Sequence, residues 1–63
     1  MCESTVFLKE GSGLTSVMVD AVRVTMSREG VVCTDLVGRS VPLDGARVAE
    51  IDLLRHRVIL ERA

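Results

Sequence analysis

The sequence is 63 residues long, enough for one small domain that buries only about 60% of the surface of its unfolded chain. Its formal net charge of -1 at pH 7 gives no strong field that would attract nucleic acid or an anionic membrane. Because no basic segment followed by a long apolar run opens the sequence, we expect a cytoplasmic protein with no signal peptide and no membrane partner. We predict a single small β-barrel domain over residues 1–63.

Valine dominates the composition and predicts an all-β protein. Eleven residues are valine, and Phe7 is the only aromatic residue. Valine side chains are stiff and pack well on pleated sheets. A small core made of such side chains is expected to be only marginally stable, and pairing of two copies would bury further apolar surface.

The first predicted strand is STVFLKE, at residues 4–10. Its alternation places Val6 and Leu8 on one face, which we expect to lie in the core. The GSG that follows predicts a turn, because glycine adopts the backbone conformations that reverse the chain.

The next segment, SVMVDAVRVTM at residues 16–26, has two interpretations. It is one long strand bent near Asp20, or two short strands. Its alternation predicts a half-buried face made of Val22, Val24 and Met26.

Turn signals divide the middle of the chain into two further strands. SREG predicts the loop of a hairpin that leads into VVCTDLV. GRSVPLDG then predicts a strand at a sheet edge or with a bulge, because Pro42 has no backbone N–H to donate. Four aspartates along the chain are expected at turns or strand ends, bonded to nearby backbone N–H groups; they are Asp20, Asp35, Asp44 and Asp52.

The last two segments, RVAEIDLL and RVILERA, predict a closing hairpin with Arg55 and His56 in its turn. The side chains expected to face the core are Ile51, Leu53, Val58 and Leu60.

The predicted elements add up to a small closed or sandwiched sheet of five or six strands. Turn signals recur about every 8 to 12 residues, a spacing typical of small barrels and sandwiches, and closure removes exposed strand edges. Several strands are apolar on both faces, as at Val6, Phe7 and Leu8. Because a second apolar face needs a cover, we expect a homodimer.

No catalytic pattern stands out, and we do not expect an enzyme. Cys33 and His56 lack an orienting third group and an oxyanion site. Cys33 lies within an apolar strand and is predicted to be a buried small side chain, with both cysteines as thiols rather than a disulfide. His56 is predicted to be a solvated loop residue, with metal ligation as the alternative.

The arginines leave a nucleic-acid role open as a second interpretation. In principle they could line an RNA groove on a small barrel; they are Arg39, Arg47, Arg55, Arg57 and Arg62. Proteins that bind single strands stack bases on aromatic side chains, and Phe7 is the only one available. Charged residues that protect sheet edges explain these arginines equally well.

Cys2 carries the most specific chemistry in the sequence. If Met1 is removed, Cys2 presents an α-amino nitrogen and a thiol, which together close a five-membered chelate ring around a metal ion. The backbone amide nitrogen of Glu3 is the next donor and closes a second ring if it loses its proton. Nitrogen and sulfur donors in one plane suit Ni(II) or Cu(II). The alternative is that Cys2 is a frayed terminal residue with an incidental thiol.

One chain offers too few strong ligands, so a two-fold dimer that brings two N-termini together would complete four-coordination.

The sequence resembles the CooT family of small nickel-binding accessory proteins, which are associated with maturation of carbon monoxide dehydrogenase. The resemblance rests on the opening MCESTVFL, on TDLVGRSVPLDGARVAEIDLLRHRVILE toward the end, and on the total length. It implies a homodimeric SH3-like or Sm-like barrel that binds Ni(II) at the N-terminal cysteine, here Cys2, as a metallochaperone or nickel store. A nickel enzyme such as carbon monoxide dehydrogenase is the implied client. The alternative is an Sm-like RNA-binding or protein-interaction module with no metal role.

Overall fold

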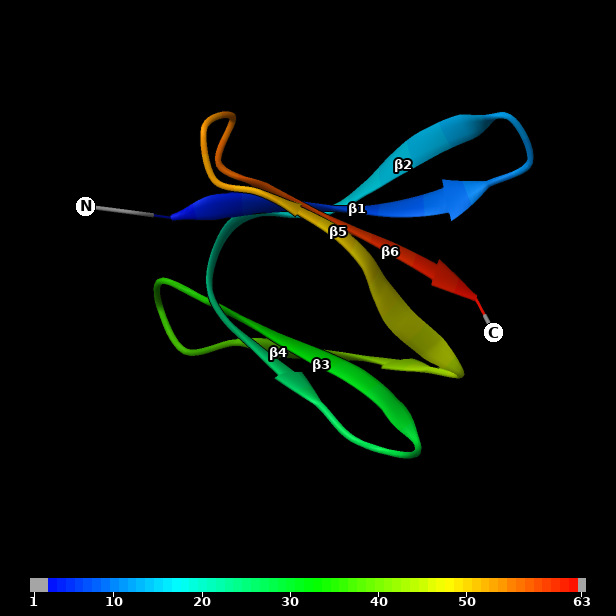
Figure 1. Cartoon of the computed structure of the whole chain (residues 1–63). Helices are drawn as coiled ribbons and strands as arrows, with labels where there is room; N and C mark the ends of the chain where they lie inside the picture. Colours follow the sequence, from blue (N-terminus) through cyan, green and yellow to red (C-terminus); the bar gives the residue numbers. More distant parts are fainter. Residues whose placement is uncertain (1–2, 63) are drawn as a thin grey trace.

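The computed structural model describes residues 3–62. They form one mixed sheet, with both antiparallel and parallel strand pairs, and contain no helix. Its strands are β1 (Ser4–Glu10), β2 (Gly13–Met26), β3 (Gly30–Asp35), β4 (Ser40–Asp44), β5 (Ala46–Asp52) and β6 (Arg57–Arg62). The strand order is β4-β3-β2-β1-β6-β5, and the sheet curls into a half-barrel (Figure 1). The prediction of a small all-β fold with five or six strands is confirmed. Within residues 3–62 there is no helix that could span a membrane.

The curl of the sheet comes from β2, which is one long strand shared by two neighbours. Its first half pairs with β1 and its second half with β3. The register shifts between Ser4 and Val6 and between Val6 and Phe7 of β1, and again between Ala21 and Arg23 of β2. At each shift β2 has one residue more than its partner strand, and such bulges bend and coil a strand. Of the two interpretations of this segment, the single bent strand is the right one.

The two ends of the chain meet in the middle of the sheet. β6 runs parallel to β1, with Thr5 opposite Arg57 and Lys9 opposite Glu61, and β5 pairs with β6 on its other side. β4 lies at the edge of the sheet beside β3, as Pro42 predicted. One apolar cluster forms the core, made of Val6, Leu8, Met18, Ala21, Val31, Cys33, Ala46, Val58 and Leu60.

The prediction that Ile51 and Leu53 face the core is wrong. Their exposed fractions are 56% and 80%. Ile51 pairs with the core residue Val58 and therefore shares its face of the sheet, but it lies one residue from the end of β5 and is not part of the core cluster. Ala46 and Val48 pack on the core instead, and Leu53 lies in the turn that follows β5.

The half-buried face predicted for the second half of β2 is only partly right. Val24 packs against the core, but Val22 and Met26 are 50% and 61% exposed. Val22 is the extra residue at the shift between Ala21 and Arg23. The core contacts of β2 therefore come mainly from Met18 and Ala21, which precede this shift. Asp20 is also displaced from its predicted place, because it lies within β2 rather than at a turn.

Candidate functional site

The chain enters β1 at one end of the half-barrel, which we call the N-terminal end. A row of paired residues crosses the sheet there, with Asp35 opposite Ala21, Ala21 opposite Ser4, Thr5 opposite Arg57, and Arg57 opposite Asp52. β3 and β5 end in this row, so the turns that follow them both lie at the N-terminal end (Figure 1).

The turn between β5 and β6 is tied directly to the start of β1. The backbone N–H of Thr5 donates a 3.0 Å hydrogen bond to the carbonyl oxygen of His56. Asp52 Oδ1 accepts a 3.0 Å hydrogen bond from the backbone N–H of Arg55 and so closes the same turn. His56 is exposed and has a φ of 53°, a left-handed conformation that is uncommon for a residue with a Cβ atom. The prediction of a solvated loop histidine is confirmed.

Four large apolar side chains are exposed in the two turns at the N-terminal end, and we call them the apolar collar. Their exposed fractions are 49% for Leu36, 72% for Val37, 80% for Leu53 and 89% for Leu54. In the sheet order β3 and β5 lie on opposite sides of β1, so the collar flanks the point at which the chain enters β1. Exposed apolar side chains at one end of a small domain are available for contact with another protein.

Of the two residues predicted to hold a metal, the structure places one. Glu3 is half-buried and directly precedes β1, whereas Cys2 lies outside the described residues. Between residues 3 and 62, no group of three or more histidine, cysteine, aspartate or glutamate side chains is arranged to hold a metal ion.

Cys33 is a core side chain, as predicted. Its exposed fraction is 0% and it packs in the apolar cluster. Burial raises the pKa of its thiol above the ordinary value, because a thiolate is poorly solvated there. Since His56 is exposed in a turn, Cys33 and His56 do not form a catalytic pair.

The five arginines considered for RNA binding all lie against oxygen atoms of the protein. The contacts are Arg39 Nε to Asp35 Oδ2 at 2.7 Å, Arg47 Nε to Glu61 Oε2 at 3.0 Å, Arg55 Nη1 and Arg57 Nε to Asp52 Oδ2 at 3.6 and 3.8 Å, and Arg62 Nη1 to the Asp44 carbonyl oxygen at 2.8 Å. Of the five, only Arg47 lies in an edge strand, β5, so the interpretation as charged edge residues fits that one alone.

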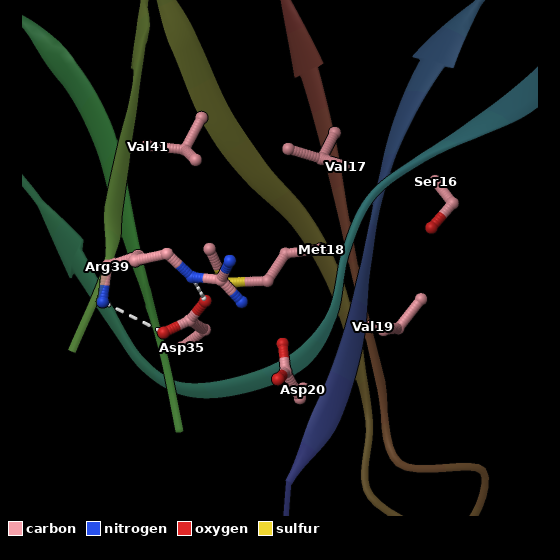
Figure 2. Close-up of a pocket in the computed structure, with 8 residues that line it drawn as sticks. All are labelled: Ser16, Val17, Met18, Val19, Asp20, Asp35, Arg39 and Val41. Carbon is pink, nitrogen blue, oxygen red and sulfur yellow. Dashed lines mark hydrogen bonds and ion pairs between the residues drawn. The ribbon is translucent and has the colours of Figure 1, made fainter. Parts of the chain in front are cut away.

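Asp35 organises the turn between β3 and β4. Its Oδ1 atom accepts a 3.1 Å hydrogen bond from the backbone N–H of Val37. Arg39 donates two more, from its backbone N–H to Oδ1 at 2.8 Å and from Nε to Oδ2 at 2.7 Å (Figure 2). Burial disfavours the charged carboxylate, but the hydrogen bonds and charge of Arg39, together with the Val37 N–H, outweigh it and lower the pKa of Asp35. The guanidinium of Arg39 is therefore held in place by a carboxylate that is itself buried.

A groove of about 380 Å³ lies between this turn and β2. It is lined by Ser16, Val17, Met18, Val19, Asp20, Asp35, Arg39 and Val41 (Figure 2).

Comparison with known proteins identifies the family. The sequence model described as "CO dehydrogenase accessory protein CooT" matches residues 1–61. The chain belongs to the CooT family. Its fold is similar to the crystal structure of a protein assigned as a CooT from Carboxydothermus hydrogenoformans, with a TM-score of 0.87, 22% sequence identity and coverage of 98% of both chains. No curated protein matches the chain.

The CooT family is described as an accessory of CO dehydrogenase rather than as an enzyme. In this CooT-family chain, sequence reasoning missed the apolar collar and the groove. The turn between β3 and β4 could have been predicted from Asp35, followed by Gly38 and Arg39. An aspartate that starts a turn accepts hydrogen bonds from backbone N–H groups a few residues later.

Proposed function

We propose that this CooT-family protein is a cytoplasmic accessory protein that binds Ni(II) at Cys2 and stores it for, or passes it to, CO dehydrogenase or another nickel enzyme. Membership of the family supports the role in enzyme maturation. The nickel step is supported by the donors of Cys2 after removal of Met1, an amine nitrogen and a thiolate, with the amide nitrogen of Glu3 as a third donor. Nitrogen and sulfur donors of this kind favour a planar Ni(II) site.

Binding of this kind depends on pH. An ordinary α-amino group has a pKa of about 7.7 to 8.0 and an ordinary thiol about 8.5. The metal must therefore displace protons near neutral pH, and nickel affinity rises as the pH is raised.

The observation that carries the proposal is the hydrogen bond from Thr5 N–H to the His56 carbonyl. This bond anchors Thr5, three residues after Cys2, at the N-terminal end of the half-barrel. The apolar collar lies at the same end. An ion held by Cys2 would then lie beside a surface suited to contact with another protein, which is what storage and transfer require. A second copy docked through the same end would bring two N-termini together and provide two amines and two thiolates.

Titration of the tag-free protein with Ni(II) tests the metal site. We expect a thiolate-to-nickel charge-transfer band that is kept in Cys33→Ala and lost in Cys2→Ser, and an N-terminal tag should weaken binding. Equal nickel affinity with and without the tag, or a band that persists in Cys2→Ser, would contradict the proposal.

Sedimentation tests the proposed homodimer. We expect a dimer that dissociates in the double variant Leu53→Glu, Leu54→Glu, which changes two exposed collar residues without touching the core. Met26→Glu is the matched control, because Met26 is 61% exposed at the far end of β2 and should leave the dimer intact. If the protein is a monomer even at high concentration, the proposed metal site shared by two copies is contradicted.

A further inference from the structure

We propose that the groove between β2 and the β3–β4 turn binds an extended peptide segment of another protein, which adds as a strand to β2 and places a basic side chain against Asp20. The proposal does not depend on nickel binding.

The lining of the groove shows that it runs along a strand edge. Five consecutive residues of β2, from Ser16 to Asp20, line it. Because successive side chains of a strand point to opposite faces, five in a row border one groove only along the edge of the backbone.

That edge of β2 is available for pairing. β1 pairs with the opposite edge of this part of β2, and β3 pairs with β2 only from Ala21 onward. The described residues therefore include no strand paired with β2 on the groove side between Ser16 and Asp20. The two register shifts against β1 within this stretch bend the edge, so we expect an added strand to pair with only part of it. An unpaired strand edge is a template for an added strand, and strand addition is a recurring mode of peptide recognition.

The size of the groove favours a single strand over a second copy of this protein. Arg39 and Val41 line the groove opposite β2. An edge strand of a second copy would carry its own neighbouring strand about 4.8 Å away, whereas a single extended segment brings no such neighbour and needs less room. The groove volume of about 380 Å³ is in the range of ligand pockets.

The charges in the groove favour a basic side chain on the bound segment. Two carboxylates and one guanidinium line it, which gives a formal charge of -1. Arg39 and Asp35 neutralise each other at 2.7 Å. Asp20 is half-buried and forms no ion pair with any residue from 3 to 62. Figure 2 shows Arg39 joined to Asp35 through its Nε and backbone N–H, and we expect its terminal nitrogens to donate to a carbonyl of the added strand.

Nitrogen-15 NMR titration with short blocked peptides tests the proposal. The probe is a seven-residue peptide of alternating threonine and valine with a central lysine, compared with the same peptide carrying a central glutamate. We expect the lysine peptide to shift the amide signals of residues 16–20 and 39–41 and to slow their hydrogen exchange. Asp20→Asn should weaken its binding about two- to fivefold, the range of an exposed ion pair. Glu50→Gln, which makes the same charge change at an exposed position of β5, should leave it unchanged.

Three outcomes would overturn the proposal. The first is that the lysine peptide leaves the signals of residues 16–20 unchanged. The second is that the two peptides bind equally and Asp20→Asn has no effect. The third is that the same signals shift with protein concentration alone, which would assign the groove to a second copy. None of these measurements involves nickel, so they are independent of the test of Cys2.

Discussion

The backbone N–H of Thr5 lies 3.0 Å from the carbonyl oxygen of His56 and donates a hydrogen bond to it. This bond extends the parallel pairing of β1 with β6 by one step into the preceding turn. It joins the first strand of the chain to the last turn, so the start of β1 contacts a backbone conformation set some fifty residues later in the sequence. That conformation is the left-handed one of His56, whose φ is 53°.

We expect His56→Gly to raise the free energy of unfolding by about 1 kcal/mol, because glycine adopts a left-handed conformation without the steric penalty of a Cβ atom. Urea unfolding measures the change. His56→Val is the control and should destabilise the protein, because a β-branched side chain fits this conformation poorly. Since His56 is exposed and is not among the proposed ligands, the nickel affinity of His56→Gly should equal that of the wild type. A large loss of nickel binding would instead make His56 a ligand.

Gly30 is the glycine whose replacement should be most harmful. Its φ is 148°, and a Cβ atom there would collide with the backbone of Leu43, Asp44 and Gly45. We expect Gly30→Ala to lower the free energy of unfolding by about 2 kcal/mol or more. Gly13→Ala is the matched control, because nothing lies within 4 Å of its Cβ position. If the two variants are equally stable, the prediction is wrong, and the end of β4 must shift at little cost to make room for the added Cβ atom.

The lowered pKa of Asp35 predicts a loss of stability in acid. A carboxyl whose pKa is lower in the folded than in the unfolded protein stabilises the fold above its ordinary pKa of about 3.9, and this contribution disappears as the pH falls through the folded value. Asp35→Asn should therefore be less stable than the wild type at pH 7, and the difference should shrink below about pH 4. Urea unfolding between pH 7 and pH 2.5 measures it, with Asp44→Asn at an exposed position as the control. A difference that stays constant over this range would contradict the assignment.

The raised pKa of Cys33 predicts the opposite dependence on pH. A thiol whose pKa is raised by folding contributes its stability below the unfolded value of about 8.5 and loses it as the pH rises through the folded value. The wild type should therefore lose more stability than Cys33→Ala between pH 8 and pH 10.

Alkylation provides a second measurement of the same burial. Iodoacetamide should label Cys33 roughly ten times more slowly in the folded protein than in urea. Cys33→Ala should lower the free energy of unfolding by about 1 kcal/mol through the lost packing. Labelling of Cys33 at the rate of an exposed thiol would show that the core opens readily at β3.

Much of the fold was determined by the sequence alone, because its signals are local. Alternation identified Val6 and Leu8 as core residues. The glycine-containing turns divided the chain into strands, and the missing N–H of Pro42 placed β4 at an edge. The chemistry proposed for Cys2 is equally local, because its amine and thiol belong to one residue.

The tertiary structure decided the features that depend on how strands are paired. Ile51 is exposed although it pairs with the core residue Val58, because the packed core does not extend to the end of β5. An extra residue in β2 exposed Val22, and the strand edge from Ser16 to Asp20 borders a groove. A bulge of this kind leaves the pattern of apolar residues unchanged while it reverses the faces to which they point.

The parallel pairing of β1 with β6 joins residues from opposite ends of the chain, and no local pattern specifies such a contact. That pairing brings the start of β1 beside the turn that holds Leu53, Leu54 and His56. The other half of the apolar collar, Leu36 and Val37, is positioned by the pairing of β3 with β2.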